Sequence, residues 1–172
     1  MSTRSNVAVM DPVDNKIKVI YVHGDGYPDG VGNCLLKYYN TFEKANELVN
    51  KGGASYLDET LEGCEFYGGD EEGCKEYSNE FNYMYDMRGD IMIEYIYLFK
   101  NNKWYVSSMK TLTKKPKDLY DNYLAYNTKF IPIEEHEEYT APKELKHSEV
   151  KMVANLTKML SEKFGEDNII SQ

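Results

Sequence analysis

The amino-acid sequence predicts a single α+β domain, residues 1–172, in which an antiparallel sheet of at least four strands is covered by short helices and a C-terminal helix. The strands are indicated by two pairs of alternating apolar segments, each pair flanking a group of turn-forming residues. The helices are indicated by apolar residues that repeat every three or four positions after residues 33 and 142. A chain of 172 residues suits one domain with one hydrophobic core.

The first hairpin is predicted at residues 6–10 and 16–22. Both segments are rich in β-branched residues, and the Asp-Pro-Val-Asp-Asn segment between them consists largely of turn formers. In the second strand Ile17, Val19 and Tyr21 point to the same face, because side chains alternate along a strand. That alternation is typical of a sheet with one buried face, which helices can cover on one side.

Two short helices are predicted after residue 33. The second has Thr41 as its N-cap and ends at Gly52 and Gly53. From residue 54 to 90 the periodicity is weak, which indicates an elaborated connection with short strands or one helix around residues 71–79. The apolar faces of the two helices are formed by Leu35, Leu36 and Tyr39 and by Phe42, Ala45, Leu48 and Val49.

The second hairpin is predicted at residues 91–99 and 103–109. A Lys-Asn-Asn turn separates its two apolar and aromatic strands. A basic connection is expected at residues 113–118, and one more strand is expected near residues 129–133.

The last part of the chain contains an acidic run and a predicted helix. The run Glu-Glu-His-Glu-Glu at residues 134–138 is interpreted as a solvated loop. Pro142 begins the helical pattern and Gly165 ends it. We expect this C-terminal helix, residues 142–165, to pack on the sheet or on another subunit.

The composition narrows the class of protein. The formal net charge of −9 argues against a nucleic-acid binder, because such proteins use clustered Lys and Arg to neutralise phosphates. No apolar run approaches the roughly 20 residues that cross a bilayer, and the N-terminal residues lack the apolar stretch of a secretory signal. Cys34, Cys64 and Cys74 are an odd number and are interpreted as reduced thiols. We therefore expect a cytoplasmic protein that contacts neither membranes nor nucleic acid.

Residues 23–33 have the strongest functional signal in the chain. Their four glycines allow backbone N–H groups to converge, and the segment leads into a predicted helix whose N-terminus favours an anion. One interpretation is a phosphate or carboxylate site, and the other is a tight crossover from strand to helix. The residues expected to bind a ligand are Arg4, His23, Asp25, Tyr27, Gly30, Gly32 and Asn33.

Signals for catalysis and for metal binding are weak. A Walker A motif needs Lys followed by Ser or Thr after its last glycine, whereas Asn33 and Cys34 follow here. No Ser or Cys lies in a nucleophile signature, and the residues after Asp25 lack two ligands of a calcium loop. We expect no catalytic residue, no cofactor and no metal. One enzymatic alternative stays open, a nucleotide-directed hydrolase or transferase that uses His23 and Asp25 as an acid-base pair.

Two segments carry a resemblance to a known group of proteins. The N-terminal Met-Ser-Thr-Arg-Ser-Asn with the hairpin after it, and the loop His-Gly-Asp-Gly-Tyr-Pro at residues 23–28, resemble small tailed-bacteriophage and prophage proteins as far as the helix ending near Gly52. The strand Trp-Tyr-Val-Ser at residues 104–107 is also similar. The group usually has Trp where this chain has Gly24, so an indole that would form a pocket wall is absent. The resemblance implies a phage protein that acts in the cytoplasm of the infected bacterium, and it identifies no catalytic residue.

These observations favour binding over catalysis. The expected protein inhibits a host or defence protein, or sequesters a small anionic ligand such as a nucleotide. In either case the guanidinium of Arg4 would donate hydrogen bonds and the ring of Tyr27 would stack on the ligand or partner. The sixteen tyrosines suit such contacts, although half-buried strands also use them. A further alternative is an acidic decoy that imitates DNA, which needs carboxylates on one face. A homo-oligomer is compatible with each alternative.

Overall fold

The computed structural model describes residues 2–68, 73–89, 92–108, 129–141, 155–160 and 162. The chain divides into two compact units, Met1–Thr140 (unit 1) and Ala141–Gln172 (unit 2). In unit 2 the described part contains a helix at residues 155–160, within the predicted 142–165 helix. The rest of that predicted helix lies outside the described residues, and the single-domain organisation stays a prediction.

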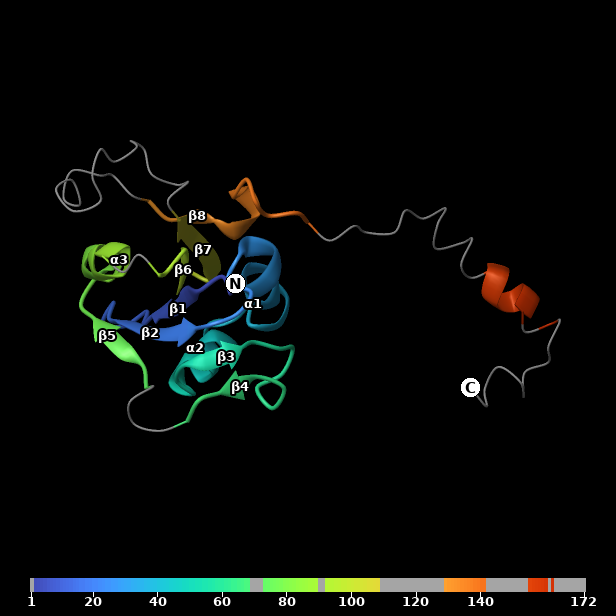
Figure 1. Cartoon of the computed structure of the whole chain (residues 1–172), viewed down its shortest axis with the longest axis horizontal. Helices are drawn as coiled ribbons and strands as arrows, with labels where there is room; N and C mark the ends of the chain where they lie inside the picture. The colour runs from blue at the N-terminus through green and yellow to red at the C-terminus, as the bar shows by residue number, and fades with distance from the viewer. Residues whose placement is uncertain are drawn as a thin grey trace. The chain divides into compact units, whose positions relative to one another are not determined.

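Unit 1 is built on one sheet whose strand order is β4-β3-β2-β1-β6-β7-β8, with β5 pairing to β2 beside this path (Figure 1). Helices accompany the sheet, so the predicted α+β class is confirmed. The strands are β1 (Ser5–Met10), β2 (Ile17–Val22), β3 (Ala54–Tyr56), β4 (Glu65–Phe66), β5 (Lys75–Tyr77), β6 (Tyr95–Lys100), β7 (Lys103–Ser108) and β8 (Ile131–Pro132).

Both predicted hairpins are present. Strands β1 and β2 pair antiparallel, and so do β6 and β7. The tight turn between β6 and β7 places Asn101 and Asn102 at φ values of 50° and 58°, in the left-handed region that asparagine tolerates. The second hairpin begins at Tyr95 rather than at residue 91.

The prediction of a purely antiparallel sheet is wrong at two places, one of which is the pairing between the two hairpins. Strand β6 pairs with β1 from Ser5↔Tyr95 to Val9↔Phe99, and β2 and β3 are also parallel at Val22↔Ala54. The chain leaves β2, forms α1 (Asn33–Tyr38), α2 (Phe42–Asn50), α3 (Glu80–Gly89) and several short strands, and enters β6 at the same end of the sheet where β1 begins. Strands that start at the same end run in the same direction, so the sheet is mixed.

The prediction of one buried face is also wrong, because apolar side chains cover both faces. Val7 and Val9 belong to one cluster, whereas Ala8, which alternates with them, belongs to the other. The first cluster includes residues of α1 and α2, and the second includes Tyr83 of α3. Side chains on opposite faces of β2 therefore pack into two different cores.

The helices confirm most of the sequence-based boundaries. Thr41 caps α2 as predicted, and its side-chain oxygen accepts a hydrogen bond from the Lys44 amide at 3.3 Å. The glycine-rich loop, expected to lack regular structure, contains one π-helical turn, η1 (Pro28–Gly32), that continues into α1. The helix expected around residues 71–79 lies at 80–89 instead, after the short strand β5.

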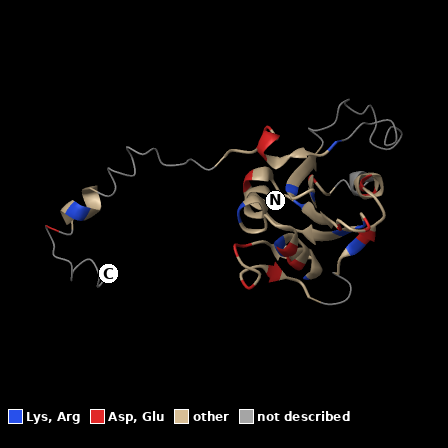
Figure 2. Cartoon of the chain, turned by 180° about the vertical axis from the view of Figure 1, so that it is seen from behind, with Lys and Arg blue, Asp and Glu red and all other residues tan. Residues whose placement is uncertain are grey.

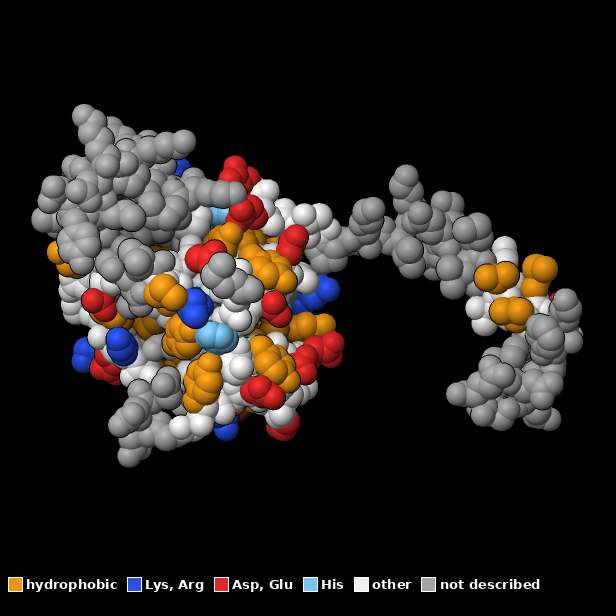
Figure 3. Space-filling view, viewed as in Figure 1, with side chains coloured by type: hydrophobic (Ala, Val, Ile, Leu, Met, Phe, Trp, Pro, Cys, Tyr) orange, Lys and Arg blue, Asp and Glu red, His pale blue; other side chains and the backbone are white. Residues whose placement is uncertain are grey.

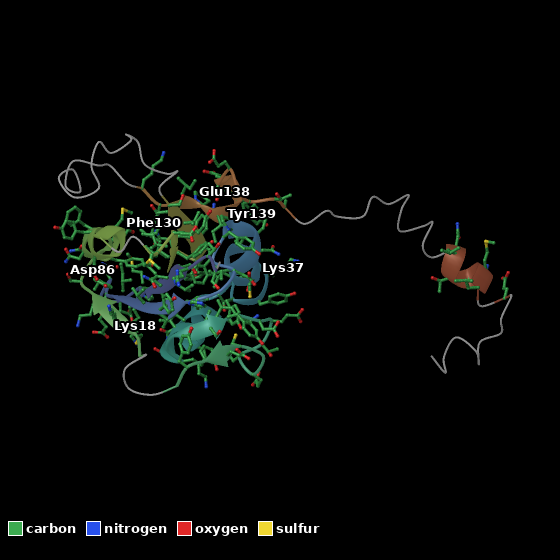
Figure 4. All side chains as sticks on the ribbon, viewed as in Figure 1. Lys18, Lys37, Asp86, Phe130, Glu138 and Tyr139 are labelled. Atoms are coloured by element: carbon green, nitrogen blue, oxygen red, sulfur yellow. The ribbon has the colours of Figure 1, made fainter. Side chains whose placement is uncertain are left out.

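The segment after β8 is only partly a solvated loop. Residues Ile133–Glu135 form a 3-10 turn, η5, in which Glu134 and Glu135 are exposed, whereas His136 is buried. In Figure 4 Glu138 and Tyr139, which follow Glu137, lie close to each other beside β8. The predicted connection at 113–118 falls outside the described residues. In the part of the chain that the structure describes, no helix has the length and apolar character needed to span a bilayer.

Candidate functional site

The glycine-rich loop is attached to the sheet on two sides. The amides of His23 and Gly24 donate to the carbonyls of Ala54 and Ser55 at 3.0 and 2.8 Å, which extends the pairing of β2 with β3. On the other side, the Gly26 amide donates to the Thr3 carbonyl at 2.9 Å. Residues 23–27 are thereby held between the start of β1 and the end of β3.

The amides of η1 do not converge on an empty anion site. The amides of three of its residues and of the residue after it donate to carbonyls of the loop itself, as in a helical turn. These bonds favour the tight crossover over the phosphate or carboxylate site. The bonds are Gly30 to Tyr27 (2.9 Å), Val31 to Asp25 (2.7 Å), Gly32 to Tyr27 (3.4 Å) and Asn33 to Gly30.

Two of the loop glycines are required by close packing. A Cβ atom at Gly30 would lie 2.2 Å from the Asp25 carbonyl oxygen, and one at Gly26 would lie 2.7 Å from the Thr3 carbonyl oxygen. Both contacts are shorter than any side-chain carbon can tolerate. The Gly26 carbonyl in turn accepts a hydrogen bond from the buried Tyr97 hydroxyl at 2.7 Å. These contacts explain the glycines without a ligand.

The predicted side chains divide into two groups. Gly32 packs against Tyr97 and Ile133, and Asn33 begins α1 with its Oδ1 atom buried and without a hydrogen-bond partner in the described part of the chain. These two residues, with Gly30, belong to the packed turn. Arg4, His23, Asp25 and Tyr27 lie instead at one end of the sheet, around the start of β1 and the end of β2.

His23 and Asp25 each have a partner other than each other. His23 Nδ1 is 2.8 Å from the Tyr21 hydroxyl, and the Tyr27 hydroxyl donates to Asp25 Oδ1 at 3.4 Å. The Asp25 carboxylate also raises the pKa of Tyr27. No hydrogen bond joins His23 to Asp25 among the described residues. This geometry does not favour their use as an acid-base pair.

An exposed tyrosine at the end of β3 was not predicted as part of a site. The Tyr56 Cβ is 3.9 Å from the Cβ position of Gly24, and the rings of Tyr56 and Tyr27 are each 41% exposed. We call Tyr27, Tyr56 and the carboxylates of segments 23–29 and 54–65 the tyrosine surface. The signal that could have identified it is charge: these two segments hold six Asp and Glu and no Lys or Arg. The carboxylates are Asp25, Asp29, Asp58, Glu59, Glu62 and Glu65.

Figure 3 shows acidic side chains around hydrophobic ones where β3, β4 and the loop between them lie. In Figure 2 acidic residues occur on this loop and also on η5 and β5, which are other parts of unit 1. The described carboxylates therefore occupy several elements rather than one face. This distribution does not favour a decoy that imitates DNA.

The loop between β3 and β4 is held against α1 by a cluster of sulfur and oxygen atoms. Tyr39 donates its hydroxyl to the Asp58 carbonyl at 2.7 Å, and the Asp58 amide donates to Cys64 Sγ at 3.2 Å. The Cys34 thiol is 3.6 Å from the same Asp58 carbonyl. Burial, followed by the nearby Cys64, raises the pKa of Cys34 to about 12.

We therefore expect Cys34 to react slowly with thiol reagents. With a pKa of about 12, only about one Cys34 in ten thousand is a thiolate at pH 8, and the thiolate is the reactive form. Alkylation with iodoacetamide at pH 8, followed by peptide mass spectrometry, should label exposed Cys74 first and leave Cys34 and buried Cys64 unlabelled. Labelling in urea should modify all three. Equal rates for Cys34 and Cys74 in the folded protein would contradict this packing.

Ser108 and His136 form a buried pair that resembles a nucleophile and its base. Ser108 Oγ is 2.9 Å from His136 Nε2, but the Glu138 amide donates to His136 Nδ1 at 3.1 Å. A nitrogen that accepts from an amide carries no proton, so the proton of the neutral ring is on Nε2 and points at Ser108. A general base needs an unprotonated nitrogen there, and both side chains are about 3% exposed. The pair joins β7 to the segment after η5, and it is not arranged for catalysis.

Two serines of the sheet provide a matched test of this assignment. Ser5 is fully buried and its Oγ atom has no hydrogen-bond partner in the described structure, so Ser5→Ala should stabilise the protein by about 1 kcal/mol. Ser108→Ala removes the hydrogen bond between Ser108 Oγ and His136 Nε2 and should destabilise by about 1 kcal/mol. Urea denaturation monitored by circular dichroism measures both. Shifts of the same sign in the two variants would contradict the hydrogen-bond assignment.

Comparison with known proteins adds no identification. No protein-family model, curated protein or solved structure matches the chain. Among the described residues, no three His, Cys, Asp or Glu side chains gather into a group that could hold a metal ion. The tyrosine surface and the side chains next to it are therefore the features from which a function can be proposed.

Proposed function

We propose that this chain is a non-enzymatic protein of phage type that acts in the infected bacterium by binding a host or defence protein through the tyrosine surface. The observation that supports the proposal best is the exposure of Tyr27 and Tyr56 on backbone that is fixed by hydrogen bonds. Tyrosines held on rigid backbone provide large contact areas at a small entropic cost, and they are frequent at the energetic centres of interfaces.

Arg4 is a cationic residue in the segment that runs beside the glycine-rich loop. Residues 3–5 run next to Gly26, and no ion pair or side-chain hydrogen bond involves Arg4 among the described residues. Its guanidinium offers five donors, so it is suited to a carbonyl or a carboxylate of the partner. Sequestration of a small anion is the weaker alternative, because the loop amides that supported it are used within the chain.

Partner capture tests the proposal. Purified wild-type protein and the variant Tyr27→Ala/Tyr56→Ala are immobilised separately and exposed to lysate of a susceptible bacterium, and the retained proteins are quantified by mass spectrometry. Val13→Ala is the control, because Val13 is 90% exposed in the turn between β1 and β2, at the opposite end of the sheet. We expect one host protein to be retained by wild type and Val13→Ala and to be lost from the double variant.

Turnover tests the enzymatic alternative. The protein is incubated with a panel of nucleotides and divalent metal ions, and the products are separated by chromatography. We expect every nucleotide to remain intact. Turnover that is lost in His23→Ala would overturn the non-enzymatic proposal, since His23 would then act as the predicted acid or base.

A further inference from the structure

The tyrosine surface has a composition that favours one kind of partner. Its two segments contain six carboxylates, two exposed tyrosines and no Lys or Arg. Asp25 accepts a hydrogen bond from Tyr27, and Glu65 lies opposite Tyr56 in the pairing of β3 with β4. A surface of this kind attracts cations and repels nucleic acid and anionic lipid.

The tyrosine hydroxyls hold ring faces and carboxylates close together. Tyr27 donates to Asp25 at 3.4 Å, and at the neighbouring helix Tyr38 donates to Glu59 at 3.2 Å. A cation that lies over a tyrosine ring therefore has a carboxylate within reach at its edge. A guanidinium is the group that fits best, because it is planar, it stacks on aromatic rings, and it binds carboxylates with two parallel hydrogen bonds.

From this arrangement we infer that the partner presents an arginine-rich surface or segment, with arginines stacked on Tyr27 and Tyr56 and paired with the carboxylates of residues 25–29 and 58–65. The inference rests on the proposed function and adds the chemistry of the partner. Attraction between opposite charges increases the rate of association, and the stacked rings then select arginine over other cations. Binding should therefore weaken as salt rises.

A defined probe tests the inference without the natural partner. The probe is a fluorescent nine-residue peptide with four arginines, and its two controls carry lysine or neutral citrulline at the same positions. Fluorescence anisotropy gives the dissociation constants for the full chain. We expect the arginine peptide to bind more tightly than the lysine peptide, and the citrulline peptide to bind least.

Three variants separate a specific surface from general attraction to an acidic protein. Tyr27→Ala/Tyr56→Ala keeps the net charge and should weaken binding about tenfold, since each exposed cation–π contact contributes roughly 0.5–1 kcal/mol. Glu62→Gln/Glu65→Gln should weaken binding about fivefold, because two exposed ion pairs are lost. Glu76→Gln/Glu135→Gln changes the net charge equally, on β5 and η5, and should stay within about twofold of wild type. All six positions are exposed, and none of them belongs to a core cluster. Circular dichroism should therefore show unchanged folding.

The outcomes distinguish this inference from the proposed function. If the peptide binds all variants equally, or if arginine and citrulline peptides bind equally, the inference is wrong. If host-protein capture still depends on Tyr27 and Tyr56 in that case, the proposed function stands with a partner of different chemistry. If capture is independent of the two tyrosines, the proposed function falls, whatever the peptide does.

Discussion

Replacing Gly30 with alanine is expected to destabilise unit 1 by about 3 kcal/mol. The added Cβ would lie 2.2 Å from the Asp25 carbonyl oxygen, which itself accepts the Val31 amide at 2.7 Å. Because the Asp25 oxygen belongs to the backbone and the position of a Cβ is fixed by its own backbone, neither atom can turn aside, so the turn must open and the hydrogen bonds of η1 are lost. Urea denaturation measures the effect, with the fluorescence of buried Trp104, the single tryptophan, as the probe.

Gly24→Ala is the matched control in the same loop. Its Cβ would lie 3.2 Å from the Ser55 carbonyl oxygen, so a small adjustment is sufficient and the cost should be about 1 kcal/mol or less. If Gly30→Ala is as stable as Gly24→Ala, then the loop is not the packed crossover described above, and its glycines need another explanation.

The second large effect is expected at Trp104, whose replacement by alanine should cost about 4 kcal/mol. Its ring is 1% exposed and meets Phe99 edge-on at a centroid distance of 5.2 Å. Its Nε1 atom donates to the Tyr39 carbonyl at 2.8 Å, which attaches the end of α1 to the sheet. The substitution therefore creates a cavity and leaves a buried carbonyl without its donor.

Circular dichroism during urea denaturation measures this variant, since the fluorescent residue is gone. Trp104→Phe should recover more than half of the loss, because it fills most of the cavity although it cannot donate to Tyr39. A loss below about 1 kcal/mol in Trp104→Ala would show that this face of the sheet is not a tightly packed core.

Local sequence signals predicted the hairpins and the helix caps. The β1–β2 and β6–β7 pairings follow from alternation and from short turns, and both are properties of adjacent residues. Thr41 identified the start of α2 for the same reason, since a cap is formed within four residues.

Long-range pairing was not predictable from such signals. The parallel pairing of β1 with β6 places Ser5 opposite Tyr95, ninety positions away in the sequence. Nothing near either residue specifies whether the two strands run parallel or antiparallel. The second core was not predicted because α3 has apolar residues on several sides, with Tyr83 buried and Phe81 exposed. A helix without a clear apolar stripe gives a weak periodic signal.

The candidate site was predicted in part. The sequence identified Arg4, His23, Asp25 and Tyr27, which lie at one end of the sheet, but it assigned ligand binding to glycine amides that the chain uses itself. Glycines that permit close packing and glycines that expose amides look the same in a sequence. Tyr56 was missed because its neighbour, Gly24, is thirty-two positions away and the contact depends on the pairing of β2 with β3.

Site-specific photocrosslinking in infected cells tests the central proposal most directly. A benzophenone amino acid is introduced in place of Tyr56 in one strain and in place of Val13 in another, and crosslinked products are identified by mass spectrometry after irradiation. We expect one host protein, with arginines near the crosslinked peptide, to be attached at position 56 and not at position 13. The same set of proteins at both positions, or no product at position 56, would contradict it.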